Sequence, residues 1–99
     1  ALFAEPVTAR QASDWGMIWE AVADEDFAEV WNERARHLAH GPSLAYRNVK
    51  RAIRGSFENS LAEQLMLEAR LQGEAGHSRD FKEGVMAFLE KRPAKFEGR

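Results

Sequence analysis

Apolar side chains recur every three or four residues along most of the chain, which is the spacing of one face of an α-helix. Two serine or threonine residues are followed three positions later by Gln or Glu, the pattern of a capping box that opens a helix. Glycine and proline stand where helices usually end. The pattern predicts an all-α fold of four to five short helices: from a Thr8 cap to about Trp15, from an Asp24 cap to Gly41, from a Ser43 cap to Gly55, from a Ser60 cap to Gly73 or Gly76, and from a Ser78 cap to Pro93.

One short segment departs from the helical spacing. Met17-Ile18-Trp19 and Val22 predict a short extended piece after the first helix, and no second segment is suited to pair with it in a sheet. At the start, Ala1 to Ala4 are apolar with no helix-start signal before them. We therefore expect the chain to be a fragment that begins inside an element of a longer protein.

The aromatic content is high for a chain of this length. Three Trp and six Phe occur in 99 residues, and burial of apolar surface stabilises by about 25 cal/mol per Å². A chain this short buries only roughly two-thirds of the surface that its unfolded form exposes. The helix after Ser60 is apolar on more than one face, which indicates more than one neighbour. We expect a partner to cover apolar surface that the chain cannot cover itself.

Charge and composition exclude several classes of function. The net charge is −2, with acids and bases mixed along the chain, so the sequence does not indicate a nucleic-acid partner. No apolar run approaches the roughly 20 residues of a membrane span. There is no cysteine, hence neither a disulfide nor a thiolate nucleophile. The expectation is a cytoplasmic protein with no membrane partner.

Three clusters of polar residues have ordinary explanations. His37 and His40 share a helix face and could begin a metal site, but interaction with the C-terminal helix dipole explains them better, and no metal site is predicted. A basic stripe on the third predicted helix could bind an anion or nucleic acid, although a solvated face is favoured. Acids near the start of the second predicted helix suit its dipole, and no catalytic residue is predicted among them. The basic stripe comprises Arg47, Lys50, Arg51 and Arg54, and the acids are Asp24, Glu25, Asp26 and Glu29.

The last segment groups an aromatic residue with cations. Phe88 lies near the end of an amphipathic helix, and Lys91, Arg92 and Lys95 follow it. An aromatic ring can stack on a base while an ammonium group meets a phosphate, so the grouping suits a nucleotide. By residue type alone, a core Phe with solvated lysines is the more common arrangement.

The order of residues resembles the enoyl-CoA hydratase/isomerase (crotonase) family over essentially the whole chain. The stretch Glu83–Arg99 resembles the family's C-terminal signature, and Ser13–Trp19 is similar to the segment that follows the family's Ala-x-x-Ala helix. Pro42, Lys50 and Ala52 also match. Within the family, Trp15–Trp19 and Gly76–Phe81 look most like the ring-epoxide isomerases of phenylacetyl-CoA degradation.

The resemblance implies an enzyme whose larger part lies before Ala1. That part would be an N-terminal ββα spiral with the acyl-CoA pocket, two oxyanion-hole N–H donors and a catalytic carboxylate. Residues 1–99 would be the C-terminal helical domain, which mediates trimerisation and forms a lid over CoA. Phe88 and Lys91 would contact the CoA adenine and its ribose phosphate.

The resemblance also implies partners and a reaction class. The chain would self-associate as a trimer or a dimer of trimers, with an acyl- or aryl-CoA thioester as substrate and no further cofactor. The substrate could be 2-(1,2-epoxy-1,2-dihydrophenyl)acetyl-CoA of phenylacetate degradation. Alone, these residues would be inactive because no position matches a family catalytic residue. The alternative is a free-standing helical module that docks another protein through its Trp and Leu faces.

Overall fold

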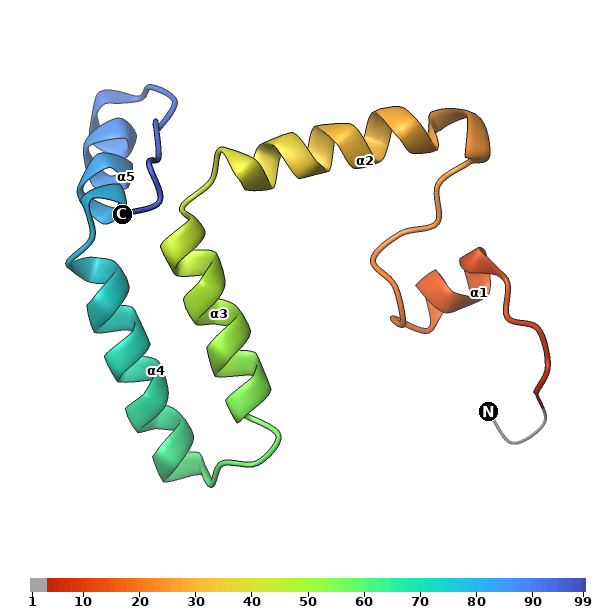
Figure 1. Ribbon diagram of the computed structural model, residues 1–99, viewed down its shortest axis with the longest axis horizontal. Coiled ribbons are helices and arrows are strands. Elements are labelled where there is room, and N and C mark those ends of the chain that lie inside the picture. The colour runs from red at the N-terminus through yellow and green to blue at the C-terminus, as the bar shows by residue number, and fades with distance from the viewer. Residues whose placement is uncertain (1–3) are drawn as a thin grey trace. The chain divides into compact units, whose positions relative to one another are not determined.

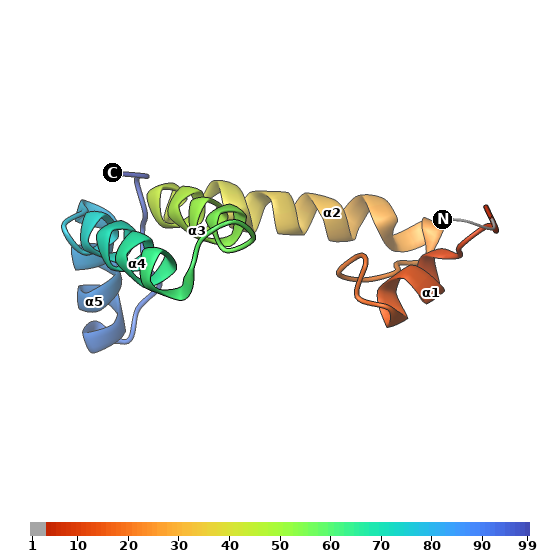
Figure 2. The same cartoon turned by 90° about the horizontal axis from the view of Figure 1, so that it is seen from below.

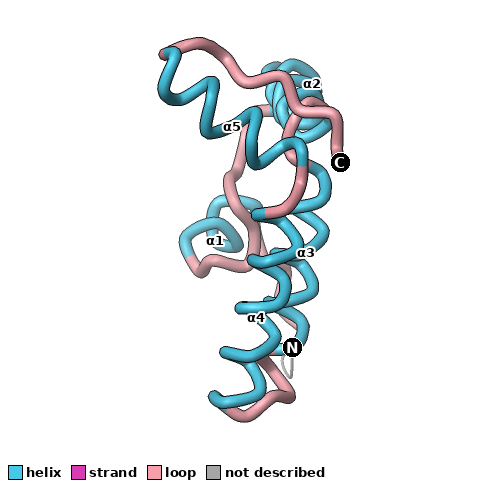
Figure 3. Tube along the Cα trace, turned by 90° about the vertical axis from the view of Figure 1, so that its left-hand side faces the viewer, coloured by secondary structure: helices cyan, strands magenta, loops and turns pink. Residues whose placement is uncertain are grey.

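A computed structural model describes residues 4–99, and in this range the secondary structure is entirely helical (Figure 1; Figure 3). Loops and turns connect the helices, and no strand occurs in the described range, so the all-α prediction is confirmed. The predicted chain start at Ala1 to Ala4 lies outside the described residues except for Ala4. The helices are α1 (Ala9–Asp14), α2 (Asp24–Ala39), α3 (Ser43–Gly55), α4 (Leu61–Gly76) and α5 (Arg79–Glu90).

Three of the predicted helix caps are confirmed. Thr8 accepts a hydrogen bond from Gln11 N at 3.2 Å and returns one through its own N–H to Gln11 Oε1 at 3.0 Å. Ser60 and Glu63 form the second capping box, with Ser60 N donating to Glu63 Oε2 at 2.8 Å. The hydroxyl and then the backbone N–H of Ser60 lower the pKa of Glu63. Ser78 caps α5, as described with the site below.

Two predicted caps are wrong by one residue. Asp24 and Ser43 are the first residues of α2 and α3 rather than the caps before them. The reason is the start of the backbone ladder: Ala23 O already accepts from Asp26 N at 3.0 Å, and Pro42 O accepts from Tyr46 N at 3.1 Å. A cap residue is the one whose carbonyl accepts the first helical bond, so each helix starts one position earlier than the side chains indicated.

The predicted extended piece at Met17 to Val22 does not form a strand. Gly16 has a positive φ of 72°, which glycine adopts readily. The turn brings Met17 N to 2.8 Å and Ile18 N to 3.3 Å from Ala12 O. The backbone therefore folds back on the end of α1, and no described segment offers a neighbouring strand.

The chain divides into two compact units, Ala1–Arg34 and Ala35–Arg99. In the first unit, Arg34 lies 5.8 Å from the centroid of the Trp19 ring and forms an ion pair with Glu20. Large apolar side chains are exposed around this contact, and Trp19 is 85% exposed. Trp15 and Trp31 are also at least half exposed. None of the aromatic side chains in residues 4–99 is buried, and the expectation that a partner covers them stays a prediction.

In the second unit, α3 and α4 run antiparallel and lie side by side, as Figures 1 and 2 show. Helix α5 follows α4 after a short turn, and the C-terminal segment returns beside α5 (Figure 1). Leu71 and Ala87 are the buried apolar residues of the described range. Asn48 is buried as well, and its amide donates to Leu71 O at 3.0 Å, which joins α3 to α4. Between residues 4 and 99, no helix is long and apolar enough to cross a membrane.

Candidate functional site

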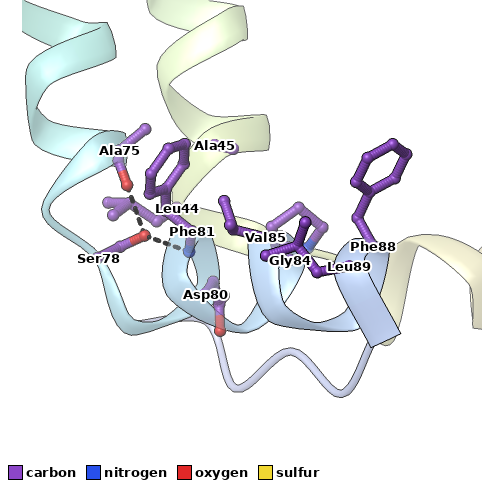
Figure 4. Close-up of a pocket in the computed structure, with 11 residues that line it drawn as sticks. Leu44, Ala45, Ala75, Ser78, Asp80, Phe81, Gly84, Val85, Phe88 and Leu89 are labelled. Atoms are coloured by element: carbon purple, nitrogen blue, oxygen red, sulfur yellow. Dashed lines mark hydrogen bonds between the residues drawn. The ribbon is translucent and has the colours of Figure 1, made fainter. Parts of the chain in front are cut away.

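An open apolar groove of about 370 Å³ lies in the second unit, where α5 meets the start of α3 and the end of α4. Figure 4 shows that Phe81 points toward Ala45 and Ala75, while Phe88 projects from the far end of α5. Phe88 is 82% exposed, so no part of its own unit covers the ring. The apolar lining is formed mainly by Leu44, Ala45, Ala75, Phe81, Val85 and Phe88.

The start of α5 is fixed by Ser78. Its hydroxyl donates to Ala75 O at 2.6 Å and accepts from Phe81 N at 3.0 Å, the two bonds drawn in Figure 4. The first bond ties α5 to the end of α4, and the second satisfies a free N–H of the first helical turn. Together they set the direction in which α5 leaves the turn, and so the position of Phe81 in the groove.

Asp80 binds the C-terminal segment. It is only 3% exposed, and its two carboxylate oxygens accept from Glu97 N at 2.7 Å and from Gly98 N at 2.8 Å. Its own N–H donates to Arg99 O at 3.0 Å. Sequence reasoning assigned no role to Asp80, because its partners are 17 and 18 residues away and no local spacing points to them.

The end of α5 carries Phe88 and Lys91, the two residues predicted to contact CoA. Lys91 is the C-cap residue and has left-handed dihedral angles, φ 52° and ψ 43°. Lys91 N donates to Phe88 O at 3.3 Å, and Arg92 N donates to Ala87 O at 3.0 Å. These two bonds are the pattern of a Schellman motif. The motif holds Lys91 at the end of the helix that presents Phe88.

The other two cations of the predicted group behave differently. Arg92 binds both oxygens of Glu83, with Nη1 at 2.6 Å from Oε1 and Nη2 at 3.0 Å from Oε2, and its Nε lies 2.5 Å from a carboxylate oxygen of Glu90. Lys95 also meets Glu83, through its backbone N–H at 2.8 Å. Of the cations that the sequence groups near Phe88, Arg92 therefore has a guanidinium that is already paired within the chain.

These contacts shift two ionisation equilibria. Hydrogen bonds from the Arg92 guanidinium, and then from Lys95 N, lower the pKa of Glu83 from 4.5 to about 2. The same pairing with Glu83, together with Glu90, raises the pKa of Arg92 above its ordinary value. The pair is thus ionised at neutral pH, and it holds the turn after α5 in place.

The other polar clusters singled out in the sequence lie on α2, just after its end, and on α3. His40 Nδ1 is 2.7 Å from Arg36 O at the end of α2, and residues 4–99 contain no group of three His, Cys, Asp or Glu side chains arranged to hold a metal ion. In the basic stripe, Arg51 pairs with Glu74 at 3.4 Å. The acids Asp24, Glu25 and Asp26 lie in the first turn of α2, where the helix dipole favours them.

Comparison with known proteins agrees with the resemblance found in the sequence. The family model described as enoyl-CoA hydratase/isomerase matches residues 1–99. A probable enoyl-CoA hydratase of Rhodobacter capsulatus is 59% identical over 99 residues, and the 1,2-epoxyphenylacetyl-CoA isomerase of Escherichia coli is 44% identical. Each alignment covers 100% of this chain and 38% of the relative.

The fold of a solved relative agrees as well. The crystal structure of an enoyl-CoA hydratase from Geobacillus kaustophilus matches with a TM-score of 0.88 at 33% identity, over 99% of this chain and 37% of that one. The chain thus spans a little over a third of the length of the relatives it matches, and within that span both sequence and backbone agree. The chain belongs to the enoyl-CoA hydratase/isomerase family, and corresponds to the helical part of its members.

Proposed function

We propose that these residues form the CoA-side, helical domain of an enzyme that acts on acyl- or aryl-CoA thioesters. In this proposal the Phe88 ring stacks on the adenine of CoA, and the Lys91 ammonium pairs with the phosphate on its ribose. The observation that carries it is the end of α5, where an exposed aromatic ring and an exposed ammonium lie one helical turn apart.

The physical chemistry of the two side chains supports this assignment. Stacking of a base on an aromatic ring contributes about 1–3 kcal/mol, and an exposed ring is available for it without rearrangement. Lys is a point charge that meets a phosphate without a fixed orientation. Arg92 is paired with Glu83, so the ammonium of Lys91 is the better phosphate ligand of the two neighbouring cations.

A second part of the proposal concerns assembly and chemistry. We propose that the chain self-associates, as a trimer or a dimer of trimers, because its described residues bury so little of their apolar surface. The oxyanion donors and the catalytic carboxylate would lie in the spiral domain of the whole enzyme. Within the proposal the reaction is isomerisation of a ring epoxide, as in the relative at 44% identity, and hydration, as the name of the relative at 59% identity says, is the alternative.

Titrating CoA into the full gene product tests the proposed nucleotide site. Phe88→Ala should weaken binding roughly 5- to 100-fold, the equivalent of the stacking energy. Lys91→Ala should weaken CoA binding by about tenfold but leave dephospho-CoA, which lacks the ribose phosphate, nearly unaffected. Calorimetry gives both dissociation constants.

Matched controls exist on the same chain. Phe57 is as exposed as Phe88, at 85%, and lies in the loop after α3, away from α5. Lys82 is an exposed lysine near the start of α5. Phe57→Ala and Lys82→Ala should leave CoA binding unchanged. Equal losses in the control and test variants would refute the assignment of Phe88 and Lys91.

A free-standing docking module is the rival function, and the exposed tryptophans of the first unit favour it. The two functions differ in what Trp19 affects. A docking module would lose a protein partner on Trp19→Ala and would show no affinity for CoA. Saturable CoA binding that depends on Lys91 would exclude the module as the sole function.

A further inference from the structure

The backbone of Lys91 adopts a conformation that its side chain disfavours. Its φ of 52° lies in the left-handed region, where a Cβ atom crowds the backbone and glycine is the usual residue at the end of a helix. A lysine keeps this conformation only if its surroundings enforce it. The proposed role of Lys91 makes the source of that enforcement important.

The enforcement comes from both sides of Lys91. Before it, the Schellman bonds to Phe88 O and Ala87 O fix the last turn of α5. After it, both carboxylate oxygens of Glu83 accept hydrogen bonds from the guanidinium of Arg92. Glu83 Oε1 also accepts from Lys95 N at 2.8 Å, so one carboxylate holds a side chain and a backbone on the far side of the turn.

We infer that Glu83 is a positioning residue for phosphate recognition: its clamp on Arg92 and Lys95 holds Lys91 in the left-handed turn that aims the ammonium at the ribose phosphate. The inference rests on the proposed function of Lys91 and adds to it a residue that touches no ligand. In this role Glu83 does not touch the phosphate. It holds Arg92 and the backbone of Lys95, and these hold the backbone of Lys91 between them and α5.

The electrostatic expectation has the opposite sign, which makes the inference testable. Replacing Glu83 by Gln removes the negative charge that pairs with Arg92, the neighbour of Lys91 in the chain, and this alone would make the site more attractive to an anion. A positioning role predicts weaker binding of the phosphate despite the gain in positive charge. Glu90 offers the matched control, since its carboxylate also meets Arg92 but does not reach the backbone of Lys95.

The experiment compares dissociation constants of CoA and dephospho-CoA in the protein as its gene encodes it. Glu83→Gln should weaken CoA roughly five- to tenfold and leave dephospho-CoA within about twofold. Glu90→Gln should bind CoA as the parent does, or more tightly. Lys91→Gly keeps the turn, because glycine takes the left-handed conformation readily, but it removes the ammonium and should lose the preference for CoA.

The double variant Glu83→Gln/Lys91→Gly separates positioning from general damage. If Glu83 acts through Lys91, the double variant binds CoA no more weakly than Lys91→Gly alone. Additive losses, or equal losses for CoA and dephospho-CoA, would overturn the inference. Arg92→Lys keeps the positive charge but cannot form the bidentate contact with Glu83, so it should reproduce the loss of CoA binding seen in Glu83→Gln. It replaces Glu83→Gln in the experiment if Glu83→Gln folds poorly.

The same variants distinguish the proposed phosphate contact of Lys91 from the positioning role of Glu83. If Lys91→Gly binds CoA as well as the parent does, the proposed function of Lys91 fails and the inference fails with it. If Lys91→Gly loses the preference for CoA while Glu83→Gln keeps it, the function of Lys91 stands and only the positioning role of Glu83 is refuted.

Discussion

Each of the two units of the chain is stabilised internally by a different kind of interaction. The second unit, Ala35–Arg99, contains two buried polar side chains, Asn48 and Asp80, and each joins segments that are far apart in the sequence. In the first unit no residue from 4 to 34 is buried, and the Arg34–Glu20 ion pair is exposed. Buried hydrogen bonds stabilise more than exposed ion pairs, because water does not compete for the partners.

The two units differ in whether buried side chains fix their geometry. The second unit fixes its own geometry around the end of α5, which carries the proposed CoA contacts. Both units leave large apolar side chains exposed, as a surface that another polypeptide covers does, but in the first unit no residue from 4 to 34 is buried. Substitutions in the second unit should therefore change stability, and those in the first should change association.

Asp80→Ala should have the largest effect. It removes two charge-assisted hydrogen bonds and leaves the N–H groups of Glu97 and Gly98 without partners, which should cost about 2–4 kcal/mol of unfolding free energy. Urea unfolding measures the loss, and Asp14→Ala, at an exposed acid in α1, is the control. An Asp80→Ala variant as stable as this control would show that the C-terminal segment contributes nothing to the unit.

Asn48 is the second buried polar residue, and a charged substitution there should cost more unfolding free energy than an uncharged one. Asn48→Ala loses the bond to Leu71 O and should cost about 1–2 kcal/mol. Asn48→Asp should cost more, because a buried carboxylate would face the Leu71 carbonyl and the Glu74 carboxylate that now accept from the amide. Asn32→Asp should change stability less than Asn48→Asp does, because Asn32 is only half-buried on α2, where its amide donates to Ala28 O at 2.8 Å. The reverse ranking of the two Asn48 variants would contradict a donor role for the amide.

The same contrast explains what the sequence could predict. The sequence predicts Thr8, Ser60 and Ser78 as caps because their partners lie three residues away, whereas the choice of Phe88 and Lys91 as CoA contacts comes from the family resemblance. Local spacing cannot show that Asp80 binds residues 97 and 98 or that Glu83 binds Arg92, because the turn after α5 creates those contacts. The same limit applies to Met17 to Val22, whose composition predicts an extended piece but cannot show that the backbone turns back on α1.

Trp19→Ala tests the first unit and should have little effect on stability. The side chain is 85% exposed, and its contact with Arg34 is an exposed cation–π pair, so the cost should be below about 1 kcal/mol. If the chain self-associates as we propose, its self-association, followed by sedimentation, should weaken clearly, because the exposed ring would lie in the surface that the assembly covers. A large loss of stability with unchanged association would reverse the contrast between the units.

Acid titration should give the smallest effect, and its direction follows from Glu83. Arg92 and Lys95 N hold the pKa of this carboxyl at about 2 in the folded chain, against an ordinary value of 4.5. The folded chain therefore binds this proton less readily than the unfolded chain does, so the ion pair stabilises the fold above about pH 4.5 and its contribution disappears as the pH falls toward 2. Unfolding measured at several pH values should show a steeper loss of stability in the parent than in Glu83→Gln, while Glu63 lowers stability with acid equally in both. Parallel curves would mean that the Glu83–Arg92 contact does not persist in solution, and the turn that carries Lys91 would then depend on the Schellman bonds alone.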